Sequence, residues 1–200
     1  MNSLYEARNS IYCYPNSNVL VNKLNIMNNS DLLKYENKMV LVKLYDLRQQ
    51  GITGEFDINH FVSIHKYLFD EIYPFAGLFR NENIAKDNFR FAEWEFIEPE
   101  LRKILNELKG ENFLKGLTKE TFSERLAYYM AELNVLHPFR EGNGRATREF
   151  IRQLALYNGY YFNLAKIDPK EMLNASIESV VHTEKLRSLI EKALDKIESK

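Results

Sequence analysis

One short stretch of the chain, residues 137–148, concentrates side chains that could do chemistry. It holds a histidine, a glutamate, two glycines around an asparagine, and two arginines: His137, Glu141, Gly142, Asn143, Gly144, Arg145 and Arg148. The glycines let backbone N–H groups approach a ligand closely, and the apolar residues Phe150, Ile151 and Leu154 predict one face of a helix. A helix N-terminus suits phosphate, because its N–H groups lack intrahelical acceptors and its dipole is positive there. We therefore expect a phosphate-binding loop that leads into a helix.

The basic residues of that helix allow two interpretations. Arg145, Arg148 and Arg152 are spaced i, i+3 and i+7, so they project from one side of the helix and could clamp a polyphosphate. An ordinary charged surface is the alternative, and we prefer it for Arg152, which Glu149 can pair with. A histidine alone is more often packed than catalytic, and it is the neighbours of His137 that favour a base.

The same stretch resembles the Fic motif, His-x-Phe-x-Asp/Glu-Gly-Asn-Gly/Lys-Arg-x-x-Arg, which marks enzymes that typically transfer AMP from ATP to a protein hydroxyl. Residues 137–148 read His-Pro-Phe-Arg-Glu-Gly-Asn-Gly-Arg-Ala-Thr-Arg, so every fixed position is filled. Two further stretches, 64–77 and 83–92, are also similar to this family. The resemblance implies a mainly α fold, a Fic-type helical bundle with one short β-hairpin flap. Phe139 is expected in its core.

The resemblance also implies roles for the residues of the motif. His137 would take the proton from the attacking hydroxyl, and N–H groups of the glycine loop would hold charge on the phosphate. Glu141 is a hard oxygen ligand suited to one Mg²⁺, a cofactor that bridges the phosphates of the substrate ATP. Arg148 would meet the γ-phosphate. The expected nucleotide-binding set is Gly142, Asn143, Gly144, Arg145 and Arg148, with Lys86, Asp87 and Asn88 of the hairpin.

The hairpin expected at 83–92 would also dock the target protein. Phe89 and Phe91 flank Arg90 after a polar turn, and we expect both rings to pack. By the family resemblance, a target segment would add to the hairpin edge as a further strand, through main-chain bonds that leave sequence preference loose. The target itself therefore cannot be identified from the sequence.

Regulation is where the sequence departs from a pattern common in the family. Many Fic proteins carry, on the chain or on a partner, an inhibitory helix with Ser/Thr-x-x-x-Glu-Gly/Asn, whose glutamate pairs with the second motif arginine. The nearest match here is 32–37, in which Leu32 replaces the hydroxyl. Glu36 could reach Arg148 as a weak inhibitor, or it could be a solvated acid on an amphipathic helix. We expect a substantially active chain, restrained by a separate inhibitory protein or by assembly, with a homo-oligomer left open.

Helical periodicity organises the rest of the chain. It predicts helices over 31–47, 57–69, 96–108, 122–136, 169–181 and 184–197, besides the one that follows the motif. Ser30 is the expected N-cap of the first and Gly51 its end. The length of 200 residues and a hydrophobic share of 45% suit one domain over 1–200, with a core at about 31–160 and C-terminal helices at about 169–197.

Composition excludes several classes of protein. A net charge of -1 argues against nucleic acid as a partner. Cys13 is the only cysteine, so no internal disulfide can form, and a reducing compartment is favoured. The other histidines, His60, His65 and His182, lack partners at metal-site spacing, and His65 is expected to pack or to hydrogen-bond within its helix. With no leader or membrane span, we expect a cytoplasmic protein that does not bind membranes.

These observations lead to a protein adenylyltransferase that modifies a hydroxyl of a target or of itself. Two alternatives stay open. One is another transfer on the same scaffold, of a different nucleotide, phosphocholine or phosphate, or the removal of AMP. The other is a non-catalytic module that binds nucleotides. The intact run of residues 142–145 and Arg148 count against phosphate transfer, because in the family they orient an ATP-like ligand for attack at the α position.

Overall fold

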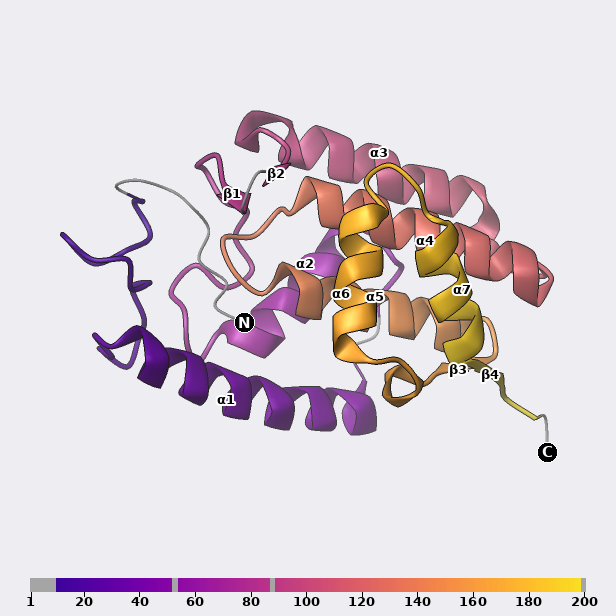
Figure 1. Cartoon of the computed structure of the whole chain (residues 1–200), viewed down its shortest axis with the longest axis horizontal. Coiled ribbons are helices and arrows are strands. Elements are labelled where there is room, and N and C mark those ends of the chain that lie inside the picture. The colour runs from indigo at the N-terminus through magenta and orange to yellow at the C-terminus, as the bar shows by residue number, and fades with distance from the viewer. Residues whose placement is uncertain (1–9, 52–53, 87–88, 199–200) are drawn as a thin grey trace.

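The computed structural model describes residues 10–51, 54–86 and 89–198, and this part of the chain is mainly helical. Its helices are α1 (Asn29–Gln50), α2 (Ile58–Phe69), α3 (Ile97–Gly110), α4 (Lys119–Leu136), α5 (Asn143–Tyr157), α6 (Pro169–Glu178) and α7 (Glu184–Ala193). Helix α5 packs against both α2 and α4, α3 and α7 pack on α4, and α6 on α7. Figure 1 shows α1 along one long side of the molecule and α3 along the other. The motif loop thus lies between α4 and α5, as expected.

Local sequence signals set the helix ends. Asn28 caps α1, because its side chain accepts a hydrogen bond from the backbone N–H three residues on. The expectation of Ser30 as the cap was wrong, since Ser30 already lies in the first turn. Gly51 ends α1 with a φ of 71°, as expected. Asp57 caps α2 and Thr118 caps α4, which begins earlier than its apolar periodicity predicts.

The expected hairpin is present as β1 (Ala85–Lys86) and β2 (Phe89–Arg90), which pair antiparallel. Its turn, residues 87–88, lies outside the described residues, and so do the binding roles expected of Asp87 and Asn88. A short 3₁₀ helix, η1 (Trp94–Phe96), follows the hairpin and precedes α3. Two more 3₁₀ helices are η2 (Asn112–Leu114) and η3 (Leu164–Lys166).

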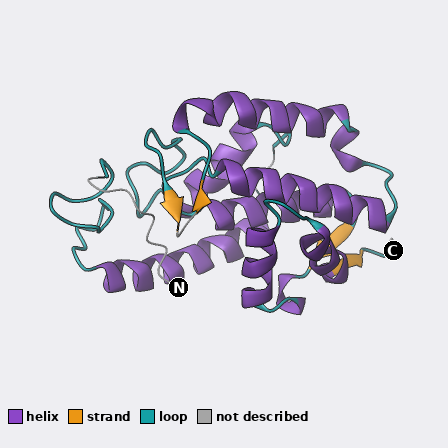
Figure 2. Cartoon of the chain, turned by 45° about the horizontal axis from the view of Figure 1, so that its top comes forward, coloured by secondary structure: helices purple, strands orange, loops and turns teal. Residues whose placement is uncertain are grey.

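A second antiparallel pair, which the sequence analysis did not predict, joins two segments that are far apart along the chain. Strand β3 (Tyr160–Phe162) pairs with β4 (Leu194–Lys196), as Figure 2 shows. The helix expected over 184–197 therefore stops at Ala193, and α6 likewise ends before 181, at Glu178. Pairing buries Leu194 beside Phe162, and this tertiary contact overrides the helical periodicity.

The core continues across the helices that flank the motif. Phe61 of α2, Leu126 of α4 and Phe150 of α5 are fully buried, and so is Phe139 of the motif loop, which confirms its expected place. Within the ranges given above, none of the helices combines the length and apolar composition that a bilayer crossing needs. Close packing of these side chains on both sides of the loop restricts the movement of its backbone.

Candidate active site

A cleft of about 1930 Å³ opens beside the N-terminus of α5. Its walls come from residues 10–20, the first half of α1, the hairpin, the end of α4, the motif loop, the start of α5 and α6. All described members of the expected site line it, namely Lys86, His137, Glu141, Gly142, Asn143, Gly144, Arg145 and Arg148. The fold thus brings residues of the motif and of the hairpin to one place.

His137 is the C-cap of α4 and turns the chain away from the helix. Its φ of 49° lies in the left-handed region, which is uncommon for a residue other than glycine. The ring nitrogen Nδ1 lies 2.9 Å from the carbonyl oxygen of Asn134. A carbonyl only accepts hydrogen bonds, so Nδ1 carries the proton, and in the neutral ring the lone pair belongs to Nε2.

The surroundings of His137 favour that neutral ring. The residue is 6% exposed, and burial lowers its pKa to about 3; the hydrogen bond to Asn134 opposes the shift, while the charges of Arg80 and Lys86 add to it. The ring of Phe91 stacks on the imidazole at a centroid distance of 3.8 Å. His137 is therefore held as an uncharged imidazole at neutral pH.

The glycine loop depends on close approach of its backbone. Gly142 precedes α5 with a φ of 80°, and a Cβ there would lie 2.3 Å from the ring of Phe69. The buried side chain of Asn143 closes the loop: its amide donates to the carbonyl of Phe139 at 2.7 Å and accepts from the N–H of Phe139 at 2.8 Å. Because the Asn143 amide is hydrogen-bonded within the loop, the first turn of α5 can bind a ligand through its backbone N–H groups.

His65 supports the loop from behind. Its Nδ1 accepts from the N–H of Gly77 at 2.9 Å, so Nε2 carries the proton and donates to the carbonyl of Glu141 at 2.9 Å. The ring stacks on Phe139 at 3.7 Å, and burial lowers its pKa to about 3. The expected packing role is confirmed, but these hydrogen bonds leave α2 instead of staying within it.

Glu141 is nearly buried at the mouth of the loop. Its Oε1 accepts from the N–H of Gly142 at 2.9 Å and lies 3.4 Å from Nη2 of Arg145. In the described part of the chain, no group of three or more His, Cys, Asp or Glu residues could hold a metal ion. One carboxylate fits Mg²⁺ only where phosphate oxygens and water supply the other ligands, which is how this cation usually binds with nucleotides.

Arg145 pairs with Glu36, which corrects both expectations for that glutamate. Glu36 is 2% exposed, so it is not a solvated acid, and its Oε1 lies 2.7 Å from Nη1 of Arg145 instead of pairing with Arg148. Tyr73 donates to the other oxygen of Glu36. Burial alone would lower the pKa of Arg145, but Glu36 and Glu141 raise it. Glu36 does not contact Arg148, because its position on α1 places the carboxylate next to Arg145, the preceding arginine of α5.

Arg148 lies near the start of α5, and no acidic residue of the described ranges pairs with it. Its Nη1 lies 3.0 Å from where a Cβ of Gly144 would stand, so the guanidinium covers the first turn of the helix. Among the described residues, none forms an ion pair or a hydrogen bond with it. Burial and then the charge of Arg145 lower the pKa of Arg148 to about 10. A bound anion would relieve both effects.

Arg152, the next basic residue of α5, forms an ion pair with Glu149, and both side chains are largely buried instead of lying on a charged surface. Its guanidinium makes two hydrogen bonds to Glu149, at 2.8 and 2.7 Å. This confirms the pairing with Glu149 that was expected for it. The polyphosphate stripe considered for the helix is therefore limited to Arg145 and Arg148.

The sequence analysis missed three residues around the site: Tyr73, Arg80 and the stacking role of Phe91. Arg80 is 2% exposed and its Nε donates to the carbonyl of His137 at 2.8 Å. An arginine next to the apolar run that ends at Phe79 is the signal that could have revealed it, because a buried cation must find acceptors.

The chain folds as a mainly helical domain with the motif loop and the hairpin on one cleft, and comparisons with known proteins give its family. A family model described as Fic/DOC matches residues 55–155, half of the chain. The chain belongs to the Fic/DOC family.

Two curated relatives are named as adenylyltransferases. The chain is 41% identical over 186 residues to protein adenylyltransferase VbhT of Bartonella schoenbuchensis, an alignment that covers 93% of this chain and 39% of VbhT. It is 37% identical over 149 residues to the probable protein adenylyltransferase Fic of Salmonella typhimurium, which covers 74% of each. The chain thus spans well under half of the length of the first relative.

Two solved structures share the fold and hold adenine nucleotides. BepC of Bartonella tribocorum with bound AMPPNP matches with a TM-score of 0.88 and 26% identity, over 94% of this chain and 97% of that one. The N-terminal Fic domain of a Bartonella quintana effector with bound ADP matches with a TM-score of 0.88 and 29% identity, over 94% and 95%.

Proposed function

We propose that this chain transfers AMP from ATP to a hydroxyl side chain of a target protein. The observation that carries the proposal is the joint position of a neutral His137 and an Arg148 that has no described acidic partner, on the walls of one cleft. Nucleophilic transfer of AMP needs both a proton acceptor and a partner for the phosphate chain.

His137 acts on the attacking hydroxyl. The oxygen of the hydroxyl forms a bond to the α-phosphorus, its proton passes to Nε2, and the bond from that phosphorus to the bridging oxygen breaks as pyrophosphate leaves. The hydrogen bond from Nδ1 to Asn134 fixes the tautomer that this step needs. Phe91 keeps the ring in place by stacking on it.

The α5 N-terminus receives the phosphates. Helix geometry leaves the N–H groups of Asn143 and Gly144 without intrahelical acceptors, so they are available to stabilise charge that develops in the transition state. Arg145 is already held by carboxylates and contributes a fixed charge. Arg148 is partly exposed and has no ion pair among the described residues, so it is available to pair with the terminal phosphate. Lys86 lines the same cleft from the hairpin.

Glu141 is the residue that would hold Mg²⁺ together with ATP. When bound, the cation would neutralise phosphate charge and orient the chain of phosphates. The contact between Glu141 and the N–H of Gly142 ties the carboxylate to the phosphate loop, which supports this placement.

An apolar wall of the cleft suits the base of the nucleotide. Ile167, Met172 and Leu173 of the η3–α6 region line it. A purine ring buries apolar surface against such side chains with few directional demands. The other end of the cleft, beside the hairpin, is left for the target segment, which would add to the hairpin as a strand.

The chain's partners and compartment belong to the same proposal. Because Glu36 does not pair with Arg148, the γ-phosphate position carries no described inhibitory carboxylate, which supports restraint by a separate protein or by assembly of the chain into oligomers. ATP as substrate and a single cysteine favour a reducing, cytoplasmic compartment.

Labelled ATP tests the proposed reaction directly. The chain is incubated with cell lysate and with ATP labelled at either the α or the γ position, and protein-bound label is measured. We expect label from the α position only. Label from the γ position would show phosphate transfer, and binding of ATP without any labelled protein would show a non-catalytic module.

A further inference from the structure

Arg80 lies in the segment between α2 and the hairpin, and its side chain is almost fully buried, at 2% exposure. Within the part of the chain that the structure describes, its guanidinium donates four hydrogen bonds to backbone carbonyls. Nε bonds to His137 at 2.8 Å and Nη2 to Leu136 at 3.3 Å, while Nη1 bonds to Glu82 at 2.8 Å and Nη2 to Ala92 at 2.5 Å. One cation therefore satisfies acceptors on two separate elements.

The first pair of acceptors closes α4. Leu136 ends the helix and His137 is its C-cap, and the last carbonyls of a helix have no intrahelical donors. They also form the negative end of the helix dipole, where a cation is favourable. The side chain of Arg80 thus stabilises the backbone that carries the His137 ring, at a residue whose φ of 49° is unfavourable for a residue other than glycine.

The second pair of acceptors lies at the two feet of the hairpin. Glu82 comes just before the 83–92 segment, and Ala92 is its last residue. Two backbone bonds run in parallel with those of the side chain: the N–H of Arg80 donates to Pro138 at 2.9 Å, and that of Ala92 to Val135 at 3.3 Å. The hairpin is therefore tied at both feet to the end of α4.

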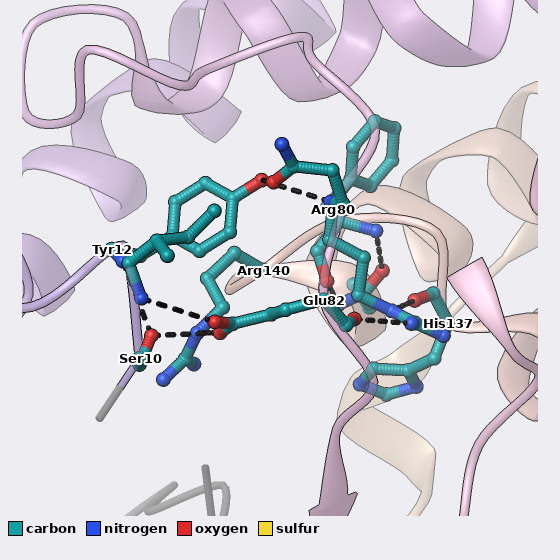
Figure 3. A network of polar contacts seen from close by, with 10 residues as sticks. Ser10, Tyr12, Arg80, Glu82, His137 and Arg140 are labelled. Atoms are coloured by element: carbon teal, nitrogen blue, oxygen red, sulfur yellow. Dashed lines mark hydrogen bonds and ion pairs between the residues drawn. The ribbon is translucent and has the colours of Figure 1, made fainter. Parts of the chain in front are cut away.

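The side chain of Glu82 extends this junction to the motif loop and the N-terminal segment. Its carboxylate pairs with Arg140 at 2.8 Å and accepts from the hydroxyl of Ser10 at 2.7 Å and the N–H of Ile11 at 3.2 Å (Figure 3). Arg140 and Glu82 are both largely buried. Glu82 is thus held at its carbonyl by Arg80 and at its carboxylate by other segments, so its position is fixed.

We propose that Arg80 is a positioning residue, which sets the imidazole of His137 and the hairpin edge relative to each other. The inference rests on the proposed function for its catalytic consequence. His137 acts on a hydroxyl that the hairpin presents, so the distance between ring and strand decides the reaction. Phe91 directly precedes Ala92, and its ring stacks on the imidazole, so the hairpin and His137 are in direct contact.

The experiment replaces Arg80 by Met, which removes these four hydrogen bonds, and by Lys, which keeps the charge and can reach fewer carbonyls. Arg125→Met is the matched control: Arg125 lies on α4, the helix that His137 caps, bonds to Glu107 and Glu111, and is outside the cleft. We measure ATP affinity, the initial rate of transfer from α-labelled ATP to lysate proteins at saturating ATP, and the ring spectrum of ¹³C-histidine.

Loss of position should lower the rate and leave ATP affinity nearly unchanged. We expect a loss of at least about tenfold for Arg80→Met, since a displacement of about 1 Å can cost on the order of 10²-fold, and an intermediate loss for Arg80→Lys. The resonances of His137 should shift in both variants while those of His60 and His182 stay. Arg125→Met should leave both the rate and the His137 resonances unchanged.

Unchanged His137 resonances and an unchanged rate in a folded Arg80→Lys protein would overturn the proposal, as would equal changes in Arg125→Met. If Arg80→Met fails to fold, the Lys variant decides. The spectrum also separates this inference from the proposed function. An unaltered chain that labels no protein contradicts the function, whereas the His137 shift in the variants still tests the positioning.

Discussion

The interior behind the motif loop and the cleft in front of it each hold a buried histidine, and the two differ in tautomer. Burial lowers the pKa of both His65 and His137 to about 3. In His65 the lone pair is on Nδ1 and accepts an N–H of the core, from Gly77. In His137 the Nδ1–H donates to the backbone carbonyl of Asn134, so the lone pair is on Nε2, and the residue lines the cleft. Burial and pKa alone thus do not distinguish a structural histidine from a base.

The two motif arginines repeat this contrast. Arg145 is held by Glu36 and Glu141 and packs its guanidinium over the ring of Phe69 at 4.8 Å. Arg148, one turn further, has no ion pair within the described chain. Uncompensated burial of a cation is unfavourable, so Arg148 is the arginine that gains most from an anion.

Replacing His137 should have the largest effect and should show most clearly that it is the base. His137→Ala is expected to lower transfer by about 10²–10⁴-fold with little change in ATP affinity, because loss of a general base has that size and the ring is placed for the hydroxyl. Transfer from α-labelled ATP and calorimetric ATP binding measure the two quantities. His182→Ala, at an exposed position, is the control. Near-normal labelling by the His137→Ala protein would show that His137 is not the base.

Arg148→Ala should weaken ATP much more than ADP. A hydrogen bond to a charged group contributes roughly 1.5–3 kcal/mol, so we expect a loss of about 10- to 150-fold in ATP affinity. Arg145→Ala is the matched comparison and should reduce binding of both nucleotides, since its charge is fixed by Glu36 and Glu141. Equal losses for the two nucleotides in Arg148→Ala would show that it does not distinguish the terminal phosphate.

Much of this contrast could not be predicted from the sequence. The motif is contiguous, so its spacing was sufficient to predict a loop, the following helix and the cleft residues. The tautomers depend on carbonyls and N–H groups that only the folded backbone supplies, such as Gly77 for His65. Arg80 and His137 are 57 residues apart along the chain, and no local pattern links them.

The fold shows the same limit. Caps and apolar periodicity were sufficient for the helices around the motif, where the signal is local. Strands β3 and β4 are short and lie on either side of α6 and α7, so their pairing is non-local and left no alternation to read. The helical periodicity of residues 31–47 could not predict that Glu36 is buried, because its partner Arg145 lies on a helix that is far away along the chain.

Acid should destabilise the fold through both buried histidines. Between about pH 3 and 6.5 the unfolded chain binds protons at these rings and the native chain does not, so the free energy of unfolding falls as pH falls. The slope approaches about 1.4 kcal/mol per pH unit for each ring. His65→Phe keeps the stacking on Phe139 and removes one titrating group, so it should lower stability at pH 7 and flatten this slope. Denaturant unfolding at several pH values measures it, and an unchanged slope would contradict a neutral His65.

The smallest expected effect concerns Glu36, and its sign decides between support and inhibition. In Glu36→Gln the amide oxygen can still accept from Arg145, but the charge is lost; a hydrogen bond to a charged group is worth about 1.5–3 kcal/mol and a neutral one about 0.5–1.5. We therefore expect ATP affinity and transfer to fall by roughly fivefold, or about 1 kcal/mol, because Arg145 is held less firmly. Tyr73→Phe, which removes the other contact of Glu36, should act in the same direction and more weakly. A strong rise in transfer by Glu36→Gln in a folded protein would show instead that Glu36 withholds Arg145 from the phosphates and restrains the enzyme.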